Sequence, residues 1–127
     1  PGNKEVEPLK FTQVAKAVCM SWQKTENCIQ GTTSLLSHCL GKGENVAFVL
    51  RDVGVLLIEG KTVKMRFYYN FLERMVGKKN LEKALFKVPQ LLDTVSPATP
   101  VASLTFSGRV LIFPEFELEV VPKSPLR

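Results

Sequence analysis

Residues 44–72 read ENVAFVLRDVGVLLIEGKTVKMRFYYNFL, and this stretch decides the fold. It begins with two apolar runs, Val46–Leu50 and Val55–Ile58, which are separated by only four residues. In residues 62–67, apolar and polar side chains then alternate, as is typical of a strand with one face in water. The sequence therefore predicts three strands joined by tight turns.

Two glycines mark the predicted turns between these strands. Gly54 closes the short connection after the first run, and Gly60 opens the two-residue loop Gly60–Lys61. A two-residue loop with glycine first suits a type II′ hairpin turn. We expect Gly54 and Gly60 to be structural turn residues, and the short loop at Gly60 leaves no room for a long hairpin arm.

The residues before the strands predict a pair of helices. Thr12 is expected to cap a short helix over Gln13–Val18, and Ser21 to cap a long helix over roughly 22–40. In the longer segment the apolar side chains recur with the period of a helix that buries one face. The segment Gly41–Gly43 supplies its C-terminal stop.

The residues after the strands predict helix and then an extended tail. Asn70–Gly77 and Leu81–Leu92 have helical spacing, and Pro89 is expected to end or kink the second. Gly108–Val121 is strand-like, and Pro114 confines it to a sheet edge or divides it into two short strands.

Length and composition bound the domain organisation. The 127 residues leave room for one domain with a core, plus a tail. We expect a loose segment over residues 1–8, one domain over 9–93, and a proline-containing linker with a strand-like tail over 94–127. The first residue is Pro1 rather than Met, which suggests a piece of a longer protein. No apolar run approaches the roughly 20 residues that cross a bilayer, so no membrane contact is expected.

The sequence holds no recognisable catalytic or metal-binding pattern. His38 is the only histidine, and Cys39 beside it on a helix cannot form the spatial pair that a Cys–His nucleophile needs. GxSxG, phosphate-loop and GxGxxG motifs are absent from the sequence. We therefore expect a non-enzyme with no catalytic residue, metal, cofactor or small-molecule substrate.

The three cysteines do not suggest a disulfide framework, because their number is odd and their spacing wide. Cys28 and Cys39 are eleven residues apart on one expected helix, about 16 Å at 1.5 Å per residue. A disulfide requires Cα atoms within about 7 Å. We expect these residues to be small, buried and reduced.

The chain carries a net charge of +5, which suits nucleic acid, an acidic partner or a merely solvated basic surface. Basic residues concentrate between positions 61 and 87, and a basic strand face followed by aromatics can contact phosphates and bases. Alternation places one tyrosine of the pair at 68–69 in the core. The residues predicted to contact nucleic acid or a protein partner are Lys61, Lys64, Arg66, Tyr68, Tyr69, Arg74, Lys78 and Lys79.

A second nucleic-acid hypothesis uses the helix pair. A short helix, a turn at 19–21 and a serine-capped second helix follow each other as in a helix-turn-helix motif. Any amphipathic helix pair gives the same pattern. The base-reading side chains would be Trp22, Gln23, Lys24 and Asn27.

The order of two helices, three tight strands and a further helix resembles the HU / integration host factor superfamily of DNA-bending proteins. The chain is most similar to the second HU-like domain of the eukaryotic coiled-coil domain-containing protein 81 family, over about residues 8–93. The segments that carry the resemblance are Pro8–Phe11, the helix holding Cys28, Asn45–Phe48, Val53–Leu56, Val63–Tyr68 and Phe71–Leu72.

This resemblance implies an α+β, HU-like fold: a helix pair, a three-stranded antiparallel sheet without a DNA-binding arm, a C-terminal helix and an extended tail. It also implies a cytoplasmic protein of the centrosome, the microtubule organizing center, whose HU-like domains serve as interaction modules.

The function favoured by this reading is protein–protein association with another HU-like domain. Bacterial HU bends DNA with a long ribbon whose tip carries a proline wedge. The two-residue loop at Gly60–Lys61 provides neither the ribbon nor the wedge. The alternative is nucleic-acid binding through residues 61–87 or the helix pair, without HU-type bending.

Overall fold

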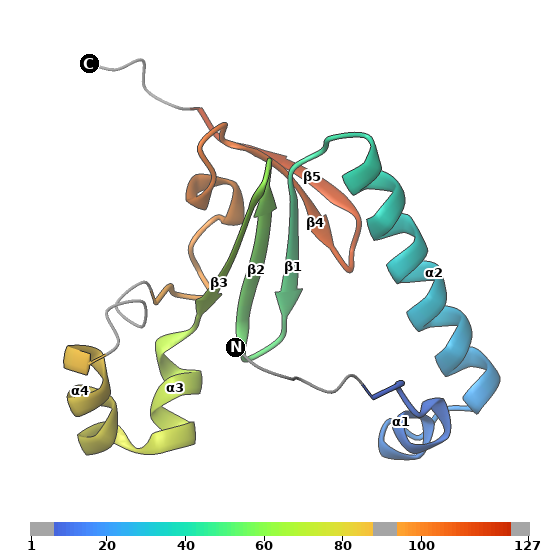
Figure 1. The fold of residues 1–127 in the computed structure, drawn as a ribbon, viewed down its shortest axis with the longest axis horizontal. Coiled ribbons are helices and arrows are strands. Elements are labelled where there is room, and N and C mark those ends of the chain that lie inside the picture. Colours follow the sequence, from blue (N-terminus) through green and yellow to red (C-terminus); the bar gives the residue numbers. More distant parts are fainter. Residues whose placement is uncertain (1–6, 88–93, 123–127) are drawn as a thin grey trace. The chain divides into compact units, whose positions relative to one another are not determined.

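The computed structural model describes residues 7–87 and 94–122. The chain divides into two compact units, residues 1–35 and 36–127. Figure 1 shows the elements in chain order. The first unit holds helix α1 (Phe11–Ala17) and the larger part of helix α2 (Trp22–Gly41).

Helix α1 begins earlier than the sequence predicts. Its N-cap is Lys10, which makes no side-chain capping bond, so Thr12 lies inside the helix. After the helix ends, the chain changes direction at Cys19, whose φ is 56°. There the Met20 N–H donates to the Ala15 carbonyl at 3.0 Å, which is the long bond of a Schellman motif. A non-glycine residue therefore provides the left-handed turn between the two helices.

Helix α2 has the predicted start and stop. The Lys24 N–H donates to Ser21 Oγ at 3.2 Å, so Ser21 caps the helix. After the helix, Gly43 has a φ of 80°, and the Glu44 N–H donates to the Cys39 carbonyl at 3.1 Å. This second Schellman motif uses glycine, which adopts positive φ without strain.

The three cysteines are free thiols, but only Cys39 is buried. Cys28 is exposed. The prediction that Cys28 is buried is therefore wrong, because its side of α2 is not covered.

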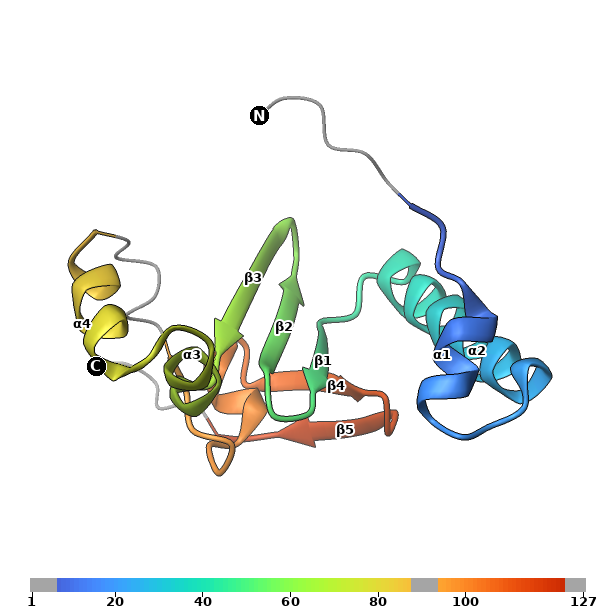
Figure 2. The ribbon, with the colours of Figure 1, turned by 90° about the horizontal axis from the view of Figure 1, so that it is seen from below.

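The second unit contains a mixed sheet with the strand order β3-β2-β1-β4-β5. Strands β1 to β3 form the predicted antiparallel series, β4 lies parallel to β1, and β5 is antiparallel to β4. Figure 2 shows the β4–β5 hairpin alongside β1. The strands are β1 (Val46–Leu50), β2 (Gly54–Glu59), β3 (Thr62–Phe67), β4 (Arg109–Phe113) and β5 (Glu117–Val120).

The predicted α+β fold class is confirmed, and the sheet is larger than the three strands expected. The region over residues 108–121 does not extend away from the domain but pairs with β1, where it satisfies backbone N–H and C=O groups that would otherwise form an edge. Pro114 falls between β4 and β5, so the predicted break into two short strands is also confirmed.

After the first three strands, the described residues of the second unit also form helical elements. They are α3 (Tyr69–Val76), α4 (Lys78–Lys87) and the 3₁₀ helix η2 (Val101–Leu104). Helix α4 begins before the predicted Leu81. Its predicted end or kink at Pro89 lies outside the described residues, as do most of the loose segment over residues 1–8 and the last five residues of the chain.

The sheet has two faces of different character. The core face carries Ala47, Val55, Leu57 and Val110, which form one buried cluster with Tyr68 and with Ala102 of η2. The opposite face, here called the aromatic face, contains a run of aromatic contacts: ring centroids lie 6.4 Å apart for Phe48 and Phe113, and 5.6 Å apart for Phe113 and Phe116. The remaining apolar side chains of the aromatic face are Val46, Leu50, Leu56, Ile58, Val63, Met65, Phe67, Leu111 and Leu118.

The two predicted turn glycines have different roles. Gly60 has a φ of 61° in a two-residue turn between the paired residues Glu59 and Thr62, as predicted. Gly54, in contrast, is the first residue of β2, and the left-handed residue of the preceding turn is Asp52, with a φ of 63°. The prediction that Gly54 is a turn residue is therefore wrong, and its role is close approach between strands.

We predict that Gly54→Ala lowers the free energy of unfolding by about 1–3 kcal/mol, as overpacking does. A Cβ at this position would lie 2.4 Å from the Arg66 carbonyl oxygen and 2.8 Å from the Phe67 Cα, both of which are backbone atoms. Urea unfolding followed by circular dichroism measures the change.

The matched control is Gly31→Ala in α2, where nothing lies within 4 Å of the added Cβ. This variant should be as stable as the native chain or more stable, by up to about 1 kcal/mol. Equal effects of the two substitutions would contradict the assignment.

Candidate functional site

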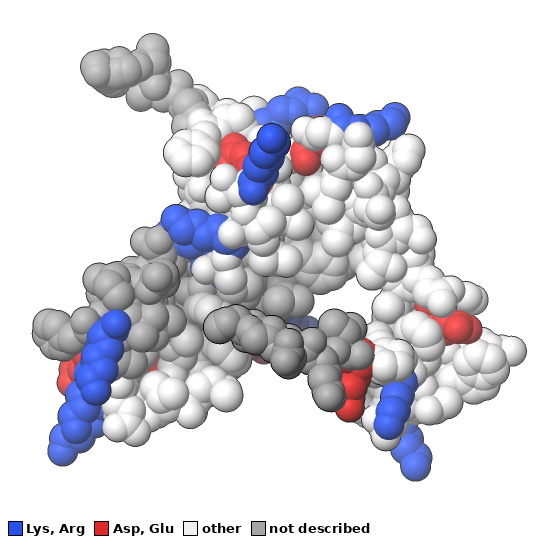
Figure 3. Space-filling view, viewed as in Figure 1, with Lys and Arg blue, Asp and Glu red and all other residues white. Residues whose placement is uncertain are grey.

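The predicted contact residues are spread over several elements of the second unit. On the face seen in Figure 3, Lys and Arg side chains stand in separate groups divided by uncharged or acidic surface. This face therefore offers no continuous basic stripe. Lys61 lies in the β2–β3 turn, Lys64 and Arg66 on β3, Tyr69 and Arg74 on α3, and Lys78 and Lys79 at the start of α4.

Tyr68 lies in the core and is removed from the predicted contact set. Its side chain is 7% exposed and belongs to the buried cluster of the core face. Burial raises the pKa of its hydroxyl, and the Asp52 carboxylate adds to that rise. The neighbouring Tyr69 is exposed, so alternation has correctly indicated that one of the pair is buried.

Arg74 has a structural contact that the sequence does not reveal. Its Nη2 donates to the Asp52 carbonyl oxygen at 3.1 Å, which joins α3 to the turn between β1 and β2. The guanidinium is thus held against the turn that precedes Gly54. This position fits support of the sheet better than contact with a ligand.

Lys64 and Arg66 are the two predicted contact residues that share a cavity. The cavity has a volume of about 180 Å³ and lies over the β2–β3 hairpin. Phe106, which is 89% exposed, forms part of its wall. The other lining residues are Leu57, Glu59, Thr62 and Leu104. The site combines two cations, a carboxylate and an exposed aromatic ring.

The Glu59 carboxylate fixes one side of this cavity. Its Oε1 accepts a hydrogen bond from the Phe106 N–H at 3.0 Å, and its Oε2 accepts one from the Ser107 N–H at 3.2 Å. Asn45 Nδ2 also donates to Oε2, at 3.3 Å. Glu59 therefore holds the segment that carries Phe106 against the hairpin. Sequence reasoning misses this contact because the partners are 47 residues apart.

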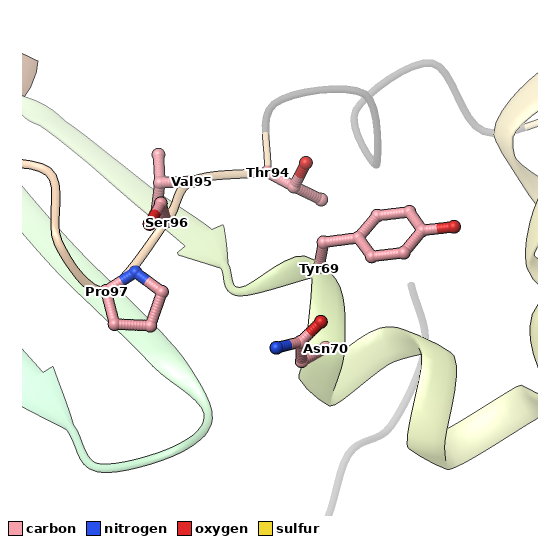
Figure 4. Close-up of a pocket in the computed structure, with 6 residues that line it drawn as sticks. All are labelled: Tyr69, Asn70, Thr94, Val95, Ser96 and Pro97. Atoms are coloured by element: carbon pink, nitrogen blue, oxygen red, sulfur yellow. The ribbon is translucent and has the colours of Figure 1, made fainter.

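A larger hollow of about 390 Å³ lies beside the start of α3. Figure 4 shows that Tyr69 and Asn70 come from α3, whereas the other labelled residues come from the segment Thr94–Pro97. The Val95 N–H donates to the Phe67 carbonyl at 3.0 Å, which joins that segment to the end of β3. The residues lining the hollow include the hydroxyl groups of Tyr69, Thr94 and Ser96 but no carboxylate, imidazole or thiol, so the lining holds no base that would activate a hydroxyl as a nucleophile.

The described part of the chain shows neither a metal-binding cluster nor a membrane-spanning helix. Among residues 7–87 and 94–122, no group of three or more His, Cys, Asp or Glu side chains could hold a metal ion. Within the same ranges, no helix is both long and apolar enough to cross a bilayer.

A known protein family matches the part of the chain that contains the helix pair and the hairpin with Lys64 and Arg66. The family model described as CCDC81 eukaryotic HU domain 2 matches residues 5–79, more than half of the chain. The chain belongs to this family. The match confirms the resemblance noted from the sequence, and it ends before η2, β4 and β5. Comparison with solved structures found no match.

We predict that Glu59→Ala lowers the free energy of unfolding of this HU-like domain by about 1.5–3 kcal/mol, the usual contribution of hydrogen bonds to a charged group. The amide protons of Phe106 and Ser107 should also exchange faster, because they lose their acceptor. Urea unfolding and NMR-detected hydrogen exchange provide the two measurements.

Glu59→Gln is the control, because it keeps one carbonyl oxygen as an acceptor and should lose less stability. Unchanged exchange at Phe106 and Ser107 in Glu59→Ala would contradict a holding role for the carboxylate.

Proposed function

We propose that the chain is a non-enzymatic HU-like module that mediates protein–protein association, with either a second copy or a tandem HU-like domain as its partner. We further propose that it acts in the cytoplasm, at the centrosome. The location rests on the family resemblance alone. The proposal involves no cofactor, membrane or small-molecule substrate.

The aromatic face of the sheet is the observation that carries this proposal. Its apolar side chains extend over all five strands, and they become exposed toward the two outer strands: Val63 is 64% exposed on β3, and Leu118 is 48% exposed on β5. Leu50 at the end of β1 is exposed as well. Val46 and Phe113, in the middle of this face, are buried, so its exposed apolar surface lies along the two outer strands and at Leu50. Exposed apolar surface of this kind can mark an interaction site.

The β2–β3 hairpin argues against DNA bending as the function. Two residues, Gly60 and Lys61, connect the strands, so the hairpin ends at the sheet. Bending by minor-groove insertion requires an apolar wedge that reaches between base steps. A hairpin that ends in this way presents no such wedge.

Nucleic-acid binding without bending is the second candidate, and the cavity with Lys64, Arg66 and Phe106 favours it. Cations beside an exposed ring can contact phosphates and stack on bases. The exposed residues at the start of α2 offer another surface of the same class. This candidate predicts DNA affinity that falls steeply with salt.

We predict that the chain self-associates in sedimentation velocity experiments and that Leu118→Lys on β5 weakens the association at least roughly tenfold, since a charge would be buried in an apolar contact. The matched control is Val76→Lys, an exposed apolar position at the end of α3 that should leave association unchanged.

A chain that stays monomeric at every concentration, and shifts a DNA duplex in low salt but not in high salt, would contradict this proposal and favour the second candidate.

A further inference from the structure

The two outer strands of the sheet carry opposite charges. Strand β3 pairs with β2 on one side, and strand β5 pairs with β4 on one side. On the core face, β3 carries Lys64 and Arg66, because these residues lie opposite Leu57 and Val55. On the same face, β5 carries Glu117 and Glu119, which lie opposite Ile112 and Val110.

The outer strands are both apolar on the aromatic face. Val63 and Met65 lie there on β3, and Leu118 and Val120 lie there on β5. Val63, Leu118 and Val120 are 64%, 48% and 59% exposed. The two strands are therefore complementary on both faces: opposite charges on one, and apolar side chains on the other.

Hydrogen bonds fix which backbone groups face outward. The Phe67 carbonyl accepts from Val95 outside the β2–β3 ladder, so by alternation the N–H and C=O groups of Val63 and Met65 point away from β2. The Val121 N–H donates to the Gly108 carbonyl at 2.7 Å. Because backbone groups along a strand point alternately to either side, the N–H and C=O groups of Leu118 and Val120 point away from β4.

The strand directions allow one sheet to continue into the next. Strand β3 runs parallel to β1, whereas β5 runs antiparallel to β4 and hence to β1. A β5 strand placed beside the β3 strand of another copy in a continued sheet is therefore antiparallel to it.

One register matches every feature of the two strands. If Met65 lies opposite Leu118, the outward backbone groups pair, and Val63 lies opposite Val120. The same register sets Lys64 opposite Glu119 and Arg66 opposite Glu117. Within β3 and β5, a shift of two residues in either direction leaves one pair of opposite charges instead of two, because Glu115 lies in the turn before β5.

We infer that β3 of one copy adds to β5 of a second copy in this register, so that copies associate end to end. The inference rests on the proposed association function and names its partner and contact. Main-chain hydrogen bonds would supply affinity, and the cross-strand side-chain pairs would supply specificity. Glu119 Oε1 already accepts a hydrogen bond from the Ala102 N–H at 2.7 Å, which holds this carboxylate on the core face.

The test exchanges charges across the proposed contact. Arg66→Glu alone sets two carboxylates opposite each other, and Glu117→Lys alone sets two cations opposite each other. Each variant should raise the dissociation constant of self-association roughly tenfold in sedimentation velocity experiments. An equimolar mixture should restore native association, because the carboxylate introduced on β3 of one variant then meets the ammonium group introduced on β5 of the other.

Two helix variants control for net charge. Lys83→Glu and Glu82→Lys change the charge by the same amounts at exposed positions of α4, and they should leave association unchanged. Thermal unfolding identifies a variant that fails to fold. If Arg66→Glu does so, the exposed Lys64→Glu takes its place and should weaken association when compared with Lys83→Glu.

The outcomes separate this contact from the broader proposal. If Leu118→Lys weakens association but the charge variants on β3 and β5 do not, the β3–β5 register is wrong and the proposed function stands. A mixture that fails to restore association also overturns the contact. A native chain that is monomeric at every concentration overturns both.

Discussion

The sheet of this HU-like domain depends on strand β1, because β1 is its central strand and joins β2 and β3 on one side to the β4–β5 hairpin on the other. Ala47, the second residue of this strand, is fully buried and lies opposite Leu57 on β2 and Ile112 on β4. Ala102 of η2 is also fully buried in the same cluster. Side chains this small allow the 3₁₀ helix and the sheet to approach closely, and interiors packed at such density tolerate little added volume. In the described part of the second unit, the short helix η2 thus closes the core on this face.

The pairing of β4 with β1 also changes which strands form the edges of the sheet. The family match covers β1, β2 and β3 but ends before β4 and β5. Without the β4–β5 hairpin, β1 itself would be an edge, with its apolar run open to other chains. With the hairpin in place, the outer strands are basic β3 and acidic β5. The part of the chain beyond the matched family region therefore supplies one of the two charged edges.

Local patterns predict the local structure of this chain well. Two apolar runs and one alternating segment identify β1, β2 and β3, the Gly60–Lys61 loop identifies a two-residue turn, and Ser21 identifies the start of α2. Each of these features depends on residues within a few positions of one another. The non-local features are different. Nothing near β1 indicates that it will pair with residues 111–113, more than 60 positions away.

The candidate site shows the same division between local and non-local information. Composition identifies Lys64 and Arg66, but the Glu59 carboxylate and the exposed Phe106 join them only through contacts between distant segments. Tyr68 and Tyr69 cannot be told apart by residue type, and the end of β3 decides which one enters the core. The role of Gly54 likewise depends on how close β3 lies to it, which no turn pattern records.

Residue-resolved amide hydrogen exchange at two protein concentrations tests association through the sheet edges most directly. The account predicts slower exchange at high concentration for the outward amides of Val63, Met65, Leu118 and Val120. The amides of Lys64 and Glu119, which face their own sheet, should show little change. An increase in mass with concentration that leaves exchange at the four outward amides unaltered would contradict association through the sheet edges.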